Sequence, residues 1–547
     1  MSFAIIPPEI LQQVGDFLYE PELATLSQCS RRLNEIFIPI LYRNLELRVY
    51  GKHLTYKGKI FPKSLVVSES AESFKEVRNL AILGCDHPYA NDKDDDGECV
   101  LLDVRKVSMV IPLMEFIKRI PVGRLLSFEY KVAFPINRQL WVQTLNLQPN
   151  IVYLHLSCRS STHAVSPNEL LKISLPSLHH FSVVNICDRN DVQIIEKILD
   201  AAYNIHIIDL VWDPNFPGTA KEDLLRLTPG IVRNNPKALR LANTSLGDEI
   251  FATFEGLEEL HLKNSVIEEG ASTGDKLLTL KRLLIISVPT FVRFYQDEII
   301  AKIRPGLEEF HLTIEHVDRD GGTEVRDTIP IPVEYILRHR ETLQYLSLFE
   351  KTSQGNMFID PGPVCSDELQ LFKELKMKEF ATAVNFYCQQ RTPAYWRTFD
   401  MSPVDVNYGH YASLDKLYIV PDMISLNTQI ENDQVEFWEL NPRNILTYQM
   451  ASIVLTNIGL YATEIPKLRY IIVGMGSAYT GQKAFEVTWL KHVPPRKKGQ
   501  KVVEAKYLFT ISPPYELNEL RSDGIEFQCF EGTRFSTEED RRVRSFW

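Results

Sequence analysis

The chain has 547 residues, of which 44% are hydrophobic and 24% charged, as is ordinary for a water-soluble globular protein. Its net charge of −11 argues against nucleic acid as the main partner, because phosphate binding needs an electropositive surface. The eight cysteines form no C-x-x-C pair, the N-terminus lacks the basic region of a signal peptide, and no apolar run is long enough to span a membrane. We therefore expect a cytoplasmic or nuclear protein with reduced thiols and no membrane partner.

The first 45 residues predict a short module of three helical pieces. Pro7 and Pro8 suit a first helical turn, where the missing N–H costs nothing. Pro21 and Pro39 are expected to separate the pieces. The pieces carry apolar residues at helical spacing: Ile10, Leu11, Val14, Phe17 and Leu18, then Leu23, Leu26, Cys29 and Leu33, then Ile36, Phe37, Ile40 and Leu41. So small a module buries too little core to be comfortably stable alone, so we expect another domain or protein to cover part of it.

These residues resemble an F-box of the form common in fungal proteins. The matching elements, in order, are Pro7-Pro8-Glu9-Ile10-Leu11, Phe17-Leu18, Leu23-Ala24-Thr25-Leu26-Ser27, Cys29-Ser30-Arg31-Arg32-Leu33 and Pro39-Ile40-Leu41-Tyr42. Leu33 departs from the pattern, because many F-boxes carry tryptophan there. The resemblance implies docking on the small adaptor of SCF-type cullin ubiquitin ligases, through Pro7, Pro8, Ile10, Leu11, Val14, Leu18, Leu23, Leu26, Leu41 and Tyr42, although some of these must face the module's own core. The alternative is an ordinary helical cap for the domain that follows.

After this module one pattern recurs: an apolar residue, two variable residues, an apolar residue, one variable residue and an apolar residue. Strong copies are Ile151–Leu156, Leu178–Val183, Ile205–Leu210, Leu257–Leu262, Leu280–Ile285, Leu307–Leu312 and Leu343–Leu348, and weaker ones are Val77–Ile82, Leu414–Ile419 and Leu468–Val473. Helical stretches are predicted between them at Asp191–Tyr203, Lys221–Arg233, Tyr295–Ile303 and Pro332–Arg340. This alternation resembles an irregular leucine-rich-repeat solenoid, with insertions near 84–100, 316–330 and 350–366. A series of doubly wound βα units is the alternative.

The predicted fold is therefore α/β: an F-box over residues 1–46, and a curved solenoid over 47–476 with parallel strands inside and helices outside. A C-terminal antiparallel cap and tail follow over 477–547. The cap is a β-hairpin of Phe485–Leu490 and Tyr507–Ser512, which would cover the edge of the last repeat. A basic loop, Pro494-Pro495-Arg496-Lys497-Lys498-Gly499, joins its strands, and we interpret this loop as a solvated turn, with nuclear import or an acidic partner as alternatives.

Two motifs carry weak signals for chemistry. Asp92, Asp94, Asp96 and Gly97, with Asp103 at the twelfth position, resemble a calcium loop, but the preceding segment predicts a strand instead of the entering helix. Gly474-Met475-Gly476 follows a strand, as in a dinucleotide-binding loop, yet Tyr479 occupies the position of the third glycine. We interpret these as a solvated acidic insertion and a turn. No nucleophile–base pair or metal set emerges, so we expect no catalysis, metal or cofactor.

The variable positions of the repeated strands are predicted to line the concave face. His155, His261 and His311 occupy equivalent positions in different repeats, too far apart to share one zinc ion, and are expected to be exposed. Arg240, Lys263 and Lys416 share such positions. As a target-binding surface this face would use Tyr153, His155, His180, Glu259, His261, Glu309, His311, Tyr345 and Tyr418.

The sequence therefore predicts a non-catalytic substrate receptor of an SCF-type ubiquitin ligase. Its partners would be the adaptor, the cullin through that adaptor, and an unidentified target protein, with no nucleic acid and no required homo-oligomer. The alternative is a scaffold or regulatory protein with the same two parts that works outside any ligase.

Overall fold

The computed structural model describes residues 6–50, 53–56, 59–60, 74–84, 116–131, 138–158, 172–214, 220–268, 277–289, 299–316, 333–352, 375–384, 387–388, 399–400, 413–421, 467–474, 482–489 and 507–511. The chain divides into two compact units, residues 1–253 and 254–547. This boundary lies inside the predicted 47–476 array, where no boundary was expected. Each unit is an α/β structure built mainly from parallel strands.

Unit 1 begins with three helices, α1 (Pro8–Gly15), α2 (Glu20–Cys29) and α3 (Arg31–Arg43). Pro8 begins α1, where it removes no helical hydrogen bond. The Tyr19 N–H at the start of α2 donates to Glu22 Oε2 at 2.9 Å, and the Leu33 N–H in α3 donates to the Ser30 hydroxyl at 3.2 Å. These contacts satisfy donors that a helix start otherwise leaves unpaired.

Pro39 does not separate two helical pieces as predicted, because α3 runs through it from Arg31 to Arg43. The separation lies instead at Ser30, whose extended backbone breaks the helix while its side chain caps the next one. The helical module also ends at Arg43, three residues before the predicted boundary at residue 46, since strand β1 starts at Asn44.

The main strands of unit 1 pair in parallel with their successors in the chain: β1 with β4, then β4 through β9 one after another. Two short strands, β2 and β3, extend β1 antiparallel. The elements are β1 (Asn44–Tyr50), β2 (His53–Tyr56), β3 (Lys59–Ile60), β4 (Asn79–Gly84), β5 (Ser127–Lys131), α6 (Arg138–Leu147), β6 (Tyr153–Ser157), β7 (His180–Ile186), α8 (Arg189–Ala201), β8 (Ile207–Trp212), α9 (Ala220–Asn234), β9 (Ala238–Ala242), β10 (Ser245–Leu246) and α10 (Asp248–Phe251).

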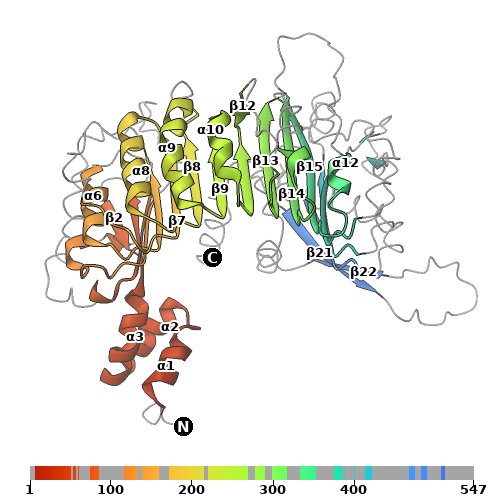
Figure 1. Ribbon diagram of the computed structural model, residues 1–547. Coiled ribbons are helices and arrows are strands. Elements are labelled where there is room, and N and C mark those ends of the chain that lie inside the picture. Colours follow the sequence, from red (N-terminus) through yellow and green to blue (C-terminus); the bar gives the residue numbers. More distant parts are fainter. Residues whose placement is uncertain are drawn as a thin grey trace, which may run out of the picture. The chain divides into compact units, whose positions relative to one another are not determined.

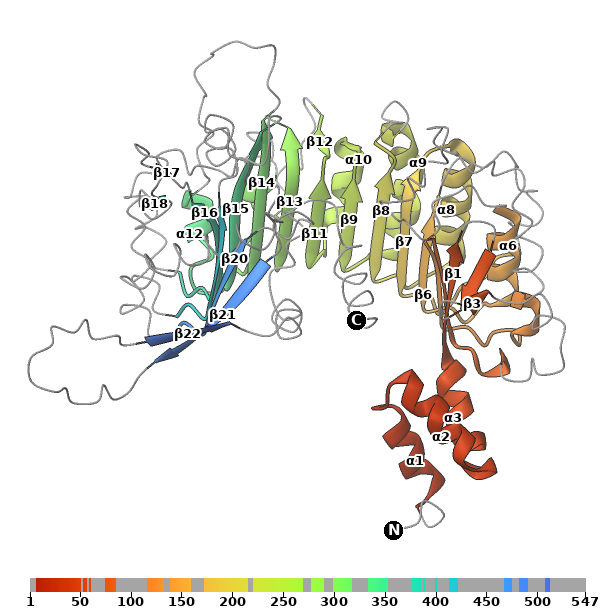
Figure 2. The same cartoon turned by 180° about the vertical axis from the view of Figure 1, so that it is seen from behind.

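The core of unit 1 lies between this sheet and its helices. Alternate strand residues such as Leu154, Phe181 and Ile208 are fully buried side by side in register. Helices α6, α8 and α9 cover one face of the strands (Figure 1). The view from behind shows the other face of the sheet, with the strands lying in front of these helices (Figure 2). We call that second face the polar face, because the remaining alternate residues, such as His155 and Asp209, belong to it.

Unit 2 continues the same construction. Its strands β11, β13, β14, β15, β16, β19 and β20 pair in parallel in chain order, and β21 and β22 then pair antiparallel. The elements are β11 (Glu259–Lys263), β12 (Val266–Ile267), β13 (Arg282–Pro289), η4 (Ile300–Lys302), β14 (Glu309–His316), α12 (Val333–Leu337), β15 (Tyr345–Thr352), β16 (Glu379–Val384), β17 (Tyr387–Cys388), β18 (Phe399–Asp400), β19 (Lys416–Pro421), β20 (Tyr470–Gly474), β21 (Gln482–Trp489) and β22 (Tyr507–Ile511). A 3-10 turn, η3 (Ala252–Phe254), spans the unit boundary.

Every predicted repeat strand is present, and the predicted C-terminal hairpin is formed by β21 and β22. The pattern missed β1, β5, β9 and β16, and its last apolar position is occupied by Tyr130 in β5 and by Thr382 in β16. The helices predicted at Asp191–Tyr203 and Lys221–Arg233 are α8 and α9. Those predicted at Tyr295–Ile303 and Pro332–Arg340 are shorter, with only η4 and α12 described there.

Asparagine adopts the left-handed conformation within or directly after several strands. Asn185, Asn243 and Asn264 have φ values of 59°, 58° and 46°, at the same position of their repeats. Their short polar side chains tolerate this conformation. The Asn185 and Asn243 amides also donate to the preceding strand, to Ser157 Oγ at 3.1 Å and to the Trp212 carbonyl at 2.6 Å.

Candidate interaction surfaces

The helical module has a small apolar core of its own. Leu11, Leu23, Leu33, Phe37 and Ile40 are central to it, and each is at most 9% exposed. Helix α1 approaches α3 closely at Gly15, since a Cβ there would lie 2.5 Å from Ile40 Cδ1. The core therefore uses a large part of the apolar residues of the three helices.

The core divides the predicted adaptor contacts into two sets. Pro7, Pro8, Ile10 and Val14 are exposed, and Leu18, Leu26 and Tyr42 are partly buried. Leu11, Leu23 and Leu41 are buried in the module, at 1%, 4% and 8% exposure, so a docked partner would not reach them. Their assignment as contacts is therefore corrected, because they hold the three helices together.

A continuous stretch from α1 to the start of α2 carries the exposed apolar side chains of the module. Ile10 and Val14, one helical turn apart, are 47% and 43% exposed. Phe17 and Tyr19, in the connection to α2, are 87% and 79% exposed. We call Ile10, Val14, Phe17 and Tyr19 the apolar surface of the module. Tyr19 was missed in the sequence, and Phe17 had been placed on a helix.

On the polar face of unit 1, His155, Ser182 and Asp209 form a chain across three neighbouring strands. They lie opposite one another in register on β6, β7 and β8. The Ser182 hydroxyl donates to Asp209 Oδ2 at 3.1 Å, and His155 Nδ1 lies 2.9 Å from the Ser182 oxygen. Because the serine proton points at the carboxylate, Nδ1 of His155 is the donor in this chain.

His155 is buried, at 7% exposure, although the sequence predicted an exposed histidine. Burial, and after it the neighbouring charges of Lys131 and His180, lower its pKa from 6.5 to about 3. Its Nε2 is also buried and has no hydrogen-bond partner among the described residues. A neutral imidazole with a fixed tautomer is thus part of the sheet and does not offer a charged contact.

On the polar face of unit 2, charged residues neutralise one another. Arg282 donates to Glu259 Oε2 at 2.7 Å and to Glu309 Oε2 at 2.5 Å, and Lys416 pairs with Glu379 at 2.9 Å. Both members of the Lys416–Glu379 pair are buried. These residues occupy one lateral row of the parallel strands, so opposite charges meet across the sheet.

Two histidines of unit 2, His261 and His311, are also buried in this network. His311 is 0% exposed, and its ring nitrogens lie 2.5 Å from Ser347 Oγ and 2.8 Å from Glu309 Oε1. His261 is 6% exposed, with Nε2 3.1 Å from Glu259 Oε1. Burial alone would raise the pKa of Glu309, but hydrogen bonds and charges from His311 and then Arg282 outweigh it and lower this pKa to about 2.

The predicted target contacts are therefore less accessible than expected. His155, His261, Glu309 and His311 are buried, so the expectation of exposed histidines was wrong. Four others are partly buried: Tyr153, His180, Glu259 and Tyr345. The rings of Tyr153 and His180 pack edge to face, with their centroids 4.7 Å apart. Tyr418 lies on β19, and its side chain is outside the described residues. Side chains of adjacent parallel strands cover one another, which the sequence pattern does not show.

Cys187, Asp188 and Asp191 are the one group in the described part of the chain whose ligand atoms lie within 4.8 Å of one another. These side chains form hydrogen bonds at the start of α8. Asp188 Oδ1 accepts from the Asn190 and Asp191 N–H groups, and Asp191 Oδ2 accepts from the Cys187 N–H and thiol. Helix capping explains this group without an ion. Among the described cysteines, Cys158 and Cys187 are buried free thiols and Cys29 is an exposed one.

The acidic segment Asp92–Asp103, the basic loop 494–499 and the insertions over most of their length lie outside the described residues, as do Met475 and Gly476 of the glycine-containing turn. Within the described part of the chain, none of the helices combines the length and the apolar character needed to cross a membrane. No protein-family model matches the chain, and no curated protein matches it either.

Proposed function

We propose that this chain is the substrate-recognition subunit of an SCF-type ubiquitin ligase, in which the helical module binds the adaptor and the repeats bind a target protein. The observation that carries the proposal is the apolar surface of the module. Ile10, Val14, Phe17 and Tyr19 remain 43–87% exposed beside a core that other side chains already fill. An exposed aromatic and aliphatic cluster of this kind is typical of a protein–protein interface.

The energetics favour a partner for this surface. Fully burying a phenylalanine or a valine side chain contributes about 1.5 to 3 kcal/mol each, so covering the cluster would provide much of the energy of a specific complex. Phe17 gains most, since 87% of it is exposed. Its connection lies between α1 and α2, which the module's own core holds in place, so the surface is largely preformed.

We further propose that each unit is built from leucine-rich repeats stacked as a solenoid. In each unit the main parallel strands are neighbours in chain order, whereas a doubly wound sheet reverses its strand order at a switch point. The recurring left-handed asparagines at Asn185, Asn243 and Asn264 also support a repeated unit. In this proposal the chain performs no chemistry itself. It holds a target so that ubiquitin transfer becomes effectively intramolecular.

The decisive experiment is co-purification of the full chain with the adaptor of SCF ligases. Val14→Asp places a charge on the apolar surface of the module, and Val232→Asp is its matched control, because Val232 lies on α9 with 46% exposure against 43% for Val14. We expect Val14→Asp to abolish binding and Val232→Asp to retain it. Equal binding by both variants would refute the assignment of this surface.

A second measurement separates a ligase subunit from a scaffold that works outside a ligase. If the chain is a ligase receptor, the cullin must co-purify with the adaptor and be lost together with it in Val14→Asp. Recovery of the adaptor without the cullin, under conditions in which a known receptor recovers both, would favour the scaffold.

A further inference from the structure

Helix α9 carries an exposed apolar stripe on its outer side. Leu225, Pro229 and Val232 follow one another at intervals of four and three residues, so they lie on one face of the helix, each about one turn from the next. Leu225 and Val232 are 45% and 46% exposed, and Pro229 is also exposed. We call these three residues the α9 stripe. The outer face of a helix that only covers a sheet is ordinarily polar, so the stripe indicates a contact with another surface.

The neighbouring helix provides an internal comparison. Helix α8 lies beside α9 and covers the same face of the sheet (Figure 1). Its exposed residues are all polar, namely Arg189, Gln193 and Asp200. An apolar outer face is therefore a property of α9 and is not shared by its neighbour.

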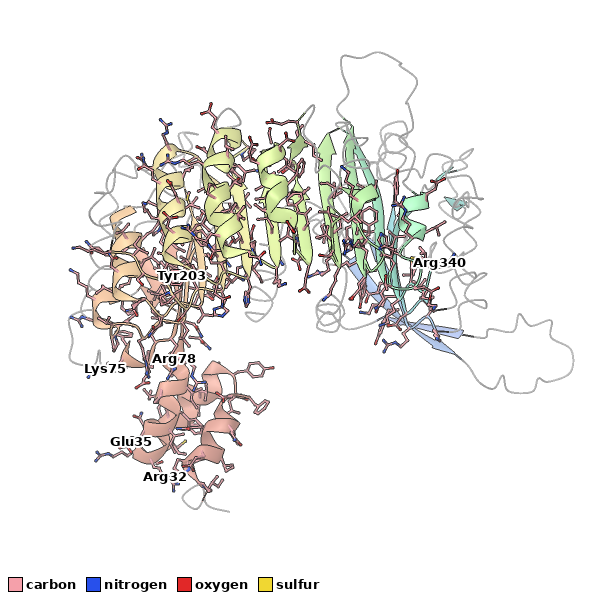
Figure 3. All side chains as sticks on the ribbon, viewed as in Figure 1. Arg32, Glu35, Lys75, Arg78, Tyr203 and Arg340 are labelled. Atoms are coloured by element: carbon pink, nitrogen blue, oxygen red, sulfur yellow. The ribbon has the colours of Figure 1, made fainter. Side chains whose placement is uncertain are left out.

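The border of the α9 stripe toward α8 is electrically neutral. Arg226 Nη2 lies 2.8 Å from Glu196 Oε2, and Arg233 donates to Asp200. Both arginines thus carry a carboxylate partner, and two such borders would not repel each other strongly. Tyr203, in the connection after α8, is 71% exposed and adds an aromatic ring at the end of the helix layer (Figure 3).

From these observations we propose that α9 forms a dimer contact, in which the α9 stripe packs against the same stripe of a second copy with the two helices antiparallel. The stripe is nearly symmetric about Pro229, so a two-fold axis there places Leu225 of one copy beside Val232 of the other. Charge fixes the direction. Exposed Glu222 lies near the start of α9 and Arg233 near its end, so antiparallel packing brings each glutamate within about one turn of the other copy's arginine. Parallel packing would place like charges together.

Pro229 adds a polar component to this contact. Proline has no N–H, so the Leu225 carbonyl cannot accept the helical hydrogen bond that residue 229 would otherwise donate. With the axis at Pro229, Arg233 of the second copy lies opposite Leu225. Its guanidinium has further N–H groups besides the one that contacts Asp200. The second copy therefore supplies both an apolar cover for the stripe and a donor for this carbonyl.

The test begins with sedimentation equilibrium of the full chain. A contact between two helices is smaller than the roughly 1,200 to 2,000 Å² of a stable interface, so we expect a weak dimer with a dissociation constant of roughly 1 to 100 µM. The measured mass should rise from that of one chain toward that of two across this range. A mass that stays at one chain up to roughly 0.5 mM would overturn the proposal and leave the stripe to a different protein.

Substitutions then locate the contact. Val232→Asp puts a charge into the stripe and should weaken self-association about tenfold or more, whereas Gln193→Asp places the same carboxylate on the exposed face of α8 and should leave it unchanged. Glu222→Lys should weaken it about two- to fivefold, because a lysine there meets Arg233 of the other copy. Circular dichroism checks that the helices are retained. Equal self-association of Val232→Asp and Gln193→Asp would overturn the proposal, and an unchanged Glu222→Lys would overturn the antiparallel geometry.

Cross-linking tests the position of the axis. In a Cys29→Ser background, which removes an exposed thiol, a short bis-maleimide should join two copies of Pro229→Cys much more efficiently than two copies of Gln193→Cys. Equal cross-linking would contradict an axis at Pro229.

The inference is independent of adaptor binding by the helical module. Val232→Asp should lose self-association and keep the adaptor, and Val14→Asp should do the reverse. Self-association that is lost in Val14→Asp and retained in Val232→Asp would overturn the proposed dimer contact without bearing on the adaptor assignment.

Discussion

Replacing His155 by asparagine should reduce the sensitivity of unit 1 to acid. An asparagine amide can still donate to the Ser182 oxygen, as Nδ1 of the imidazole does, but it does not titrate. In the folded chain the pKa of His155 is about 3, against an ordinary value of 6.5. As the pH falls through 6.5, the unfolded chain therefore binds a proton that the folded chain refuses, and the folded state loses stability until the pH reaches about 3.

These two pKa values set the size of the effect. Over the whole window the loss has an upper limit of about 5 kcal/mol, and between pH 7 and pH 5 it amounts to about 2 kcal/mol. At pH 7 both states leave His155 neutral, so the substitution has little electrostatic effect there. The loss of the ring's packing is the same at each pH, and comparing the two pH values removes it.

The assay is urea unfolding of the full chain at pH 7 and pH 5, followed by tryptophan fluorescence, since Trp141 and Trp212 lie buried in unit 1. Hydrogen exchange of β6 and β7 then assigns the change to that part of the sheet. His206→Asn is the control, because His206 is exposed. We expect this control to follow the wild type and His155→Asn to lose about 2 kcal/mol less between the two pH values. An identical pH dependence in all three proteins would refute the reasoning.

Two further predictions follow from buried contacts. Glu309→Gln should destabilise unit 2 by up to about 3 kcal/mol at pH 7, because the folded pKa of this carboxylate is depressed to about 2. A carboxylate whose folded pKa is depressed stabilises the fold above about pH 4.5, and this stabilisation declines as the pH falls toward 2. The wild type should therefore be more stable than Glu309→Gln at pH 6, and the difference should be smaller at pH 3. Denaturation at the two pH values measures both. Leu11→Ala should cost the helical module about 2 to 5 kcal/mol and expose α1 to α3 to hydrogen exchange, whereas Ile10→Ala, at an exposed position, should not. Unchanged protection in Leu11→Ala would contradict the core described for the module.

Much of the fold was predictable because the apolar residues of the repeated pattern are the residues that the strands bury. An apolar residue at alternate strand positions is buried whichever neighbour it meets, so strands such as β6, β7 and β14 were predicted from residues 151–156, 178–183 and 307–312 alone. Strands β5 and β16 escaped because Tyr130 and Thr382 stand at positions where the pattern expects an aliphatic residue. Pro39 was wrongly predicted to separate two helical pieces, because proline usually breaks a helix and the residue alone does not reveal that α3 continues past it.

The candidate surfaces were predicted less well, because exposure depends on neighbours that are distant in the chain. Leu11 and Val14 carry the same periodic signal, yet α3 covers Leu11 and leaves Val14 exposed. His155 is buried beside residues 27 positions away, and Glu309 meets Arg282 at the same separation.

The sequence by itself therefore determined the alternation of strands and helices and the presence of an N-terminal helical module, since local hydrophobic periodicity encodes both. The tertiary structure alone decided which polar residues are partners and which apolar residues remain exposed. The physical reason is that these properties arise where parallel strands from separate repeats meet, about 4.8 Å apart in space but some twenty or more residues apart in the chain.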